Sequence, residues 1–109
     1  MATTYKVLGQ IVPSATTLTT LYTVPSATST VCSSLVICNE GTTTETFRIA
    51  IRPAGAAVDP KHYITYDSSV TQNNSVFLTL GFTLATTDVV SVYTSGASIG
   101  FSLFGSEIA

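Results

Sequence analysis

Short segments in which apolar and polar side chains alternate recur along the whole chain, and residues that favour turns separate them. The clearest alternation lies in residues 46–52, with Phe47, Ile49 and Ile51 on one face and Arg48, Ala50 and Arg52 on the other. A period of two is typical of a β-strand with one buried face. No window of about a dozen residues shows the apolar stripe and the caps of an amphipathic helix. The pattern therefore predicts an all-β protein.

Eight segments carry this strand signal: 5–11, 18–24, 30–38, 46–52, 62–67, 76–83, 88–94 and 99–104. Residues 30–38 are the most apolar and predict a buried central strand, whereas Gly9 predicts a bulge or bend in the first strand. Short strands at fairly even spacing favour a β-sandwich or a barrel. Eight strands in a chain of 109 residues suit the double sheet of a jelly roll. We expect a single domain over residues 1–109, an eight-stranded antiparallel β-sandwich that is jelly-roll-like.

The composition argues against several classes of protein. Four Lys and Arg against six Asp and Glu leave no basic footprint for a nucleic acid. The longest aliphatic stretches fall far short of the roughly 20 residues of a membrane span. Hydrophobic residues at 45% and a net charge of −2 argue against disorder. We therefore expect neither a nucleic acid nor a membrane as partner, and the first residues show no secretory leader.

The chain is poor in charge, since charged residues make up 9% against about 25% in ordinary soluble proteins. Its 20 Thr and 13 Ser can supply polar surface, and Thr also suits strands because it is β-branched. Alternatively, other chains cover much of the surface. We favour the second interpretation, which predicts a homo-oligomer, most simply a homotrimer.

Two cysteines, Cys32 and Cys38, lie six residues apart in one expected strand. At about 3.3 Å per residue they would be roughly 20 Å apart, too far for a disulfide. We expect free, half-buried thiols, as suits a protein made in a reducing cytoplasm.

The residue types that carry catalysis are scattered. His62 and Asp67 lie an odd number of residues apart, so in a strand they face opposite sides and form no dyad. Glu40 and Glu45 flank one turn, where solvated acids are common, and the aspartates lack the spacing of a calcium loop. We therefore expect no enzymatic activity, no metal and no cofactor.

The most notable polar group is basic. Arg48 and Arg52 share a face of the fourth expected strand, and Lys61 and His62 open the fifth. If these two strands are neighbours, most of the positive charge of the chain gathers in one place. This cluster is either a solvated surface that balances Glu40 and Glu45 or a docking contact for an acidic partner. We take Arg48, Arg52, Lys61 and His62 as the candidate docking residues.

Five segments together resemble a known family. They are Leu21-Tyr22-Thr23-Val24-Pro25, residues 31–39 ending in Cys38-Asn39, Phe47-Arg48-Ile49-Ala50, Thr87-Asp88-Val89-Val90, and Phe104-Gly105-Ser106-Glu107. The chain resembles small all-β virion structural proteins of tailed bacteriophages, and the resemblance covers nearly its whole length. It implies a module that is made in the host cytoplasm and assembles on a virus particle.

Head decoration (cement) proteins and tail or baseplate accessory proteins both use modules of this kind. Because no fibre-like or coiled-coil stretch accompanies the domain, we expect a capsid decoration protein that stabilises the head. Its partners would be further copies of itself and the major capsid protein or another virion protein. The alternative is a tail or baseplate adhesion protein with a receptor- or carbohydrate-binding role.

Overall fold

The computed structural model describes residues 2–109, apart from the side chain of Leu80. These residues form eight strands and two short 3-10 helices. The strands are β1 (Thr3–Ile11), β2 (Thr19–Thr23), β3 (Ser29–Asn39), β4 (Glu45–Arg52), β5 (Tyr63–Val70), β6 (Ser75–Leu84), β7 (Val89–Thr94) and β8 (Ile99–Ile108). The helices are η1 (Pro53–Gly55) and η2 (Pro60–His62), and both lie between β4 and β5.

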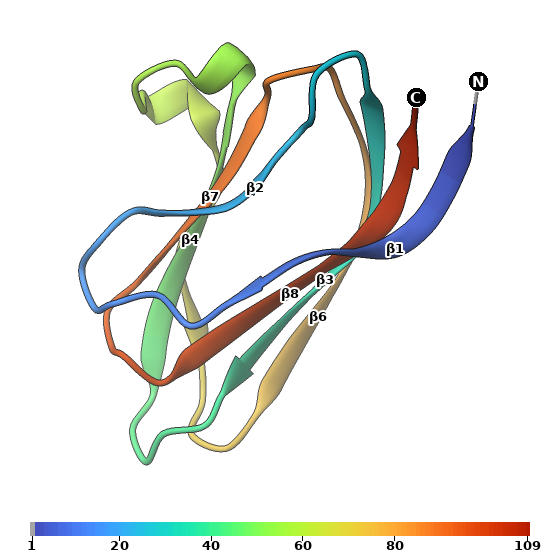
Figure 1. Cartoon of the computed structure of the whole chain (residues 1–109). Helices are drawn as coiled ribbons and strands as arrows, with labels where there is room; N and C mark the ends of the chain where they lie inside the picture. Colours follow the sequence, from blue (N-terminus) through green and yellow to red (C-terminus); the bar gives the residue numbers. More distant parts are fainter. Residues whose placement is uncertain (1) are drawn as a thin grey trace.

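The strands divide into two four-stranded sheets, ordered β1-β8-β3-β6 and β2-β7-β4-β5. Every pairing is antiparallel. The pairs β1 with β8, β2 with β7, β3 with β6, and β4 with β5 are those of one long hairpin rolled into two layers (Figure 1). This is the strand order of a jelly roll. The expected antiparallel sandwich is thereby confirmed.

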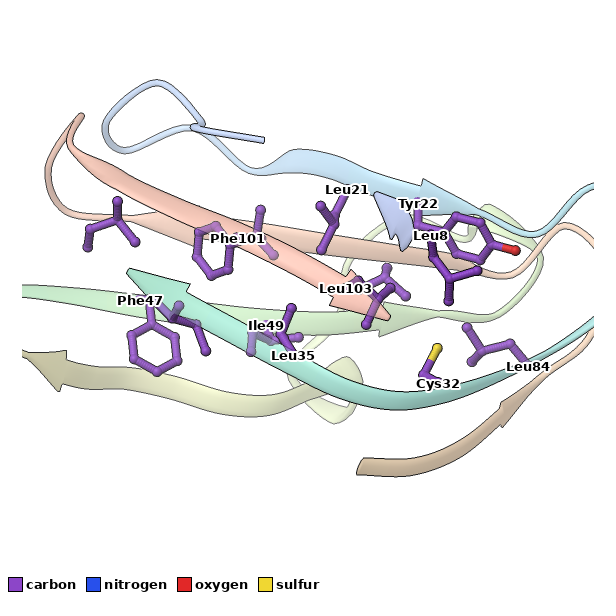
Figure 2. Close-up of a cluster of buried hydrophobic side chains, with 14 of the residues drawn as sticks. Leu8, Leu21, Tyr22, Cys32, Leu35, Phe47, Ile49, Leu84, Phe101 and Leu103 are labelled. Atoms are coloured by element: carbon purple, nitrogen blue, oxygen red, sulfur yellow. The ribbon is translucent and has the colours of Figure 1, made fainter. Parts of the chain in front are cut away.

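The core lies between the two sheets (Figure 2). Phe47 and Ile49 of β4 face Phe101 and Leu103 of β8, and all four are at most 2% exposed. The rings of Phe47 and Phe101 meet edge to face, with 6.2 Å between their centroids. The alternation in residues 46–52 therefore identifies the buried face correctly.

A bulge in β3 changes which side chains the core receives. The pairing of β3 shifts register between Cys32 and Ser34 against both of its neighbours, β6 and β8. Cys32 and Leu35 both point into the core as a result, although an uninterrupted strand places residues three apart on opposite faces. Both cysteines are free, as expected, but Cys32 is completely buried and only Cys38 is half-buried.

Most strand boundaries differ from the sequence expectation by one to four residues, and the differences at β8 and β5 are the most informative. β8 continues four residues beyond position 104 to Ile108, because it pairs along this length with both β1 and β3. Reciprocal backbone hydrogen bonds between Ala2 and Ala109, both 2.9 Å, close the end of this sheet. β5 begins after His62 rather than with it, because Asp59 caps the turn of η2 over residues 60–62.

Candidate docking surfaces

The four predicted docking residues lie on or beside the outer face of the β2-β7-β4-β5 sheet. β4 and β5 are neighbours, which is the arrangement that the basic cluster required. Arg48 Nε donates to Asp67 Oδ1 of β5 at 2.7 Å, and Nη2 donates to Oδ2 at 3.3 Å. The guanidinium also lies 4.0 Å from the ring centroid of Tyr66 and 4.2 Å from that of Tyr93. Arg48 is thus enclosed by two aromatic rings and paired with a carboxylate.

This pairing determines the charge that Arg48 presents outward. The hydrogen bonds with Asp67 raise the pKa of the Arg48 guanidinium above its usual value, which is already high. The Arg48 side chain is 22% exposed and that of Asp67 is 45% exposed, so both members of the ion pair reach solvent. An acidic partner would have to displace Asp67 to pair with Arg48.

Arg52 holds the segment that follows β4. Its Nε donates to the Ala56 carbonyl at 2.7 Å, and its Nη2 donates to the Gly55 carbonyl at 3.1 Å. Nη1 reaches the hydroxyl of Ser91 on β7 at 3.2 Å. These bonds fasten η1 against the sheet, so replacing Arg52 also affects the fold of this loop.

Lys61 and His62 lie in the η2 turn. Lys61 is exposed. His62 is only 8% exposed, and its Nδ1 accepts a hydrogen bond from the backbone N–H of Asp59 at 3.1 Å. The expectation that His62 opens the fifth strand is corrected here, because His62 ends the η2 turn and closes a capping box with Asp59. Whether the four residues dock a partner stays a prediction.

A second surface was not found from the sequence. The strands β1, β8, β3 and β6 contain only two charged residues, Lys6 and Glu107, and these pair with each other at 3.1 Å. The outer face of this sheet, called here the outer sheet face, carries large exposed apolar side chains. Tyr5 is 84% exposed, Val7 is 46% exposed and Phe77 is 75% exposed. A shallow hollow of about 600 Å³ runs along it.

The position of Phe77 within β6 explains its exposure. Its neighbours Val76 and Leu78 pack against the core, so the alternation of β6 forces Phe77 outward. Alternation in the expected strand 76–83 therefore already predicts from the sequence that Phe77 faces outward. An uncharged sheet face with exposed aromatic side chains is typical of a surface that another protein covers.

Among residues 2–109, no group of three or more His, Cys, Asp or Glu side chains lies close enough to hold a metal ion. The same residues include no helix with the length and apolar character needed to traverse a bilayer. The predictions that the protein is not an enzyme and uses no cofactor remain predictions.

Comparisons with known proteins identify a shared fold. No protein-family model matches the chain, and no curated protein matches it. A chain of the T13 viral particle of IBDV is similar in structure, with a TM-score of 0.57 and 11% identical residues over 97% of this chain and 29% of the viral chain. A chain from infectious bursal disease virus, Gx strain, has a TM-score of 0.48 and 12% identity over 97% and 32% of the two chains.

This chain thus spans less than a third of the length of the two viral chains. At 11% identity the likeness establishes the fold alone: the sandwich of this protein also occurs within a chain of a virus particle.

Proposed function

We propose that this protein is a non-enzymatic structural component of a virus particle. More specifically, it is a capsid decoration protein of a tailed bacteriophage that binds the major capsid protein or another virion protein. The observation that carries the proposal is the jelly-roll sandwich, which a chain of the IBDV particle shares over 97% of this chain. The sequence resemblance to small phage virion proteins supplies the phage assignment.

The outer sheet face supports an assembly role on physical grounds. Isolated soluble proteins rarely expose large contiguous apolar patches. Tyr5 and Val7 on β1 and Phe77 on β6 lie on the two edge strands of a sheet whose two charged residues pair with each other. A partner that covers this face therefore removes exposed apolar side chains from water without burying an unpaired charge of these strands. Burial of apolar area contributes about 25 cal/mol per Å², and repeated sites on a particle add their binding.

The experiment compares two double variants for incorporation into particles. Tyr5→Asp with Phe77→Asp places charge on the outer sheet face. Arg48→Ala with Lys61→Ala removes two cations of the basic cluster and leaves the contacts of Arg52 in place. If the basic side docks an acidic surface, occupancy falls in the variant that lacks Arg48 and Lys61. If the outer sheet face docks, occupancy falls in the aspartate variant. Normal occupancy of both folded variants would contradict docking through either surface, and absence of the wild-type protein from particles would contradict the function itself.

A further inference from the structure

A groove of about 450 Å³ lies beside the segment that Arg52 and η2 hold in place. Its lining consists of Val58, Asp59, Pro60, Tyr63 and Tyr66. The groove joins an apolar wall to one carboxylate, a combination common in small-ligand sites, where few polar groups fix the orientation of a ligand. The assembly role argued above does not use it.

Two tyrosines form a right-angled corner in this groove. The rings of Tyr63 and Tyr66 are 5.0 Å apart with an interplanar angle of 89°. Tyr66 is 58% exposed, so part of its ring is open to a ligand. The corner offers a ligand two aromatic surfaces at once.

The corner is fixed before any ligand arrives. Arg48 lies 4.0 Å from the ring centroid of Tyr66, and Tyr93 and Asp67 hold Arg48 from two further sides. Such support lowers the entropy that binding must overcome. Exposed aromatic side chains without support lose more freedom when they bind.

Asp59 supplies the polar group. Its Oδ2 accepts the backbone N–H of Lys61 at 3.4 Å, and the side chain also takes part in the capping box with His62, so the exposed carboxylate is held in one orientation. A carboxylate only accepts hydrogen bonds, so it favours a ligand rich in hydroxyl donors and opposes a row of peptide carbonyls. This argues against a proline-rich peptide, which also favours aromatic grooves.

The surrounding charges argue against a cationic ligand. The guanidinium of Arg48 already occupies a place beside the Tyr66 ring, and Lys61 follows Asp59 at a distance of two residues. The charges of Arg48 and Lys61 balance those of Asp67 and Asp59, so the groove has no net negative charge that would attract a cation. A neutral ligand with an apolar face and hydroxyl groups at its edge matches this arrangement of aromatic rings and charges best.

We infer that this groove binds a neutral saccharide. The C–H face of a pyranose ring packs in the corner of Tyr63 and Tyr66, and ring hydroxyls donate to Asp59. The inference goes beyond the structural role and does not depend on it, since the groove lies on the opposite sheet from Tyr5 and Phe77.

The test is a glycan array with the purified full chain, followed by titration with the best neutral glycan. We expect Tyr66→Ala to weaken binding about tenfold or more and Tyr66→Phe to retain most of it, because the ring is kept. Asp59→Asn should weaken binding too, while asparagine still caps η2. Tyr5→Ala removes an equally exposed tyrosine from the other sheet and is the matched control, expected to leave binding unchanged.

If the protein binds no neutral glycan on the array even at millimolar concentration, the inference is overturned. Equal losses in Tyr66→Ala and Tyr5→Ala also overturn it, and so does a preference for a quaternary ammonium probe over every neutral glycan. Loss of glycan binding in Tyr66→Ala with normal incorporation into particles would separate this site from the assembly function.

Discussion

A small polar network joins the two sheets at one end of the sandwich. The hydroxyl of Tyr22 on β2 donates to Glu107 Oε2 on β8 at 2.6 Å and lies 2.7 Å from the hydroxyl of Thr30. Lys6 Nζ lies 3.1 Å from the other oxygen of Glu107. Burial, together with the bond to Glu107, raises the pKa of Tyr22, so the phenol stays protonated and remains a donor.

The first prediction concerns Glu107→Gln. The hydrogen bond from Tyr22, and then Lys6, lower the pKa of Glu107 in the folded state below its usual value of about 4.3. A depressed folded pKa stabilises the fold above the unfolded pKa, and this contribution disappears as pH falls through the folded pKa. Glu107→Gln should therefore lower the free energy of unfolding at pH 7 by about 1 kcal/mol, since the amide keeps a weaker acceptor.

Urea unfolding at pH 7 and pH 3 measures this effect, with exposed Glu40→Gln as control. The deficit of Glu107→Gln should shrink at pH 3. A deficit of equal size at both pH values would show that the charge of Glu107 is irrelevant to stability.

The second prediction concerns the thiols. Burial raises the pKa of Cys32 to about 11, so almost none of it is thiolate at neutral pH. A thiol reagent should modify half-buried Cys38 first and reach Cys32 only on unfolding. Mass spectrometry of the intact protein follows the order of labelling. A mass two daltons low with no labelling would instead reveal a disulfide and contradict the strand geometry.

At the scale of the elements, a few side-chain hydrogen bonds hold residues 53–62 in place. Arg52 donates to the carbonyls of Gly55 and Ala56, and Asp88 Oδ1 accepts the backbone N–H of Ala54. Arg52→Ala should cost about 1–2 kcal/mol and speed amide exchange in this segment, because hydrogen bonds to a charged group are lost. Arg52→Lys keeps the positive charge but lacks the several N–H donors of the guanidinium. It should therefore restore only part of the protection of this segment against amide exchange. Unchanged exchange in Arg52→Ala would contradict this role.

Alternation along the chain was enough to predict the elements, as residues 46–52 show, because a half-buried strand must repeat every two residues. The bulge at Cys32 and Ser34 and the length of β8 were missed, since both depend on pairing with strands far away in the sequence. The strand order is likewise set by tertiary contacts.

The surroundings of Arg48 illustrate the same limit for the site. Its partner Asp67 has a backbone φ of 53°, and the pairing of β5 with β4 shifts register beside it. An extra residue in β5 therefore redirects the carboxylate toward Arg48, which an ideal alternation does not anticipate. The exposed Phe77, by contrast, follows directly from alternation.

For the whole molecule, the low content of charged residues predicts self-association, most simply as a trimer, and the outer sheet face is the candidate contact between copies. We expect light scattering at high protein concentration to give the mass of three 11.4 kDa chains. Tyr5→Asp with Phe77→Asp should shift the protein to monomers without loss of its fold, because both side chains are more than two-thirds exposed. A wild-type protein that stays monomeric at every concentration would contradict this prediction.

The most direct measurement of the central claim is mass spectrometry of purified virus particles combined with an image reconstruction of the particle. The structural role predicts that this chain is present in many copies and that its sandwich fits density on the outside of the head. A chain absent from purified particles, though abundant in infected cells, would contradict the account.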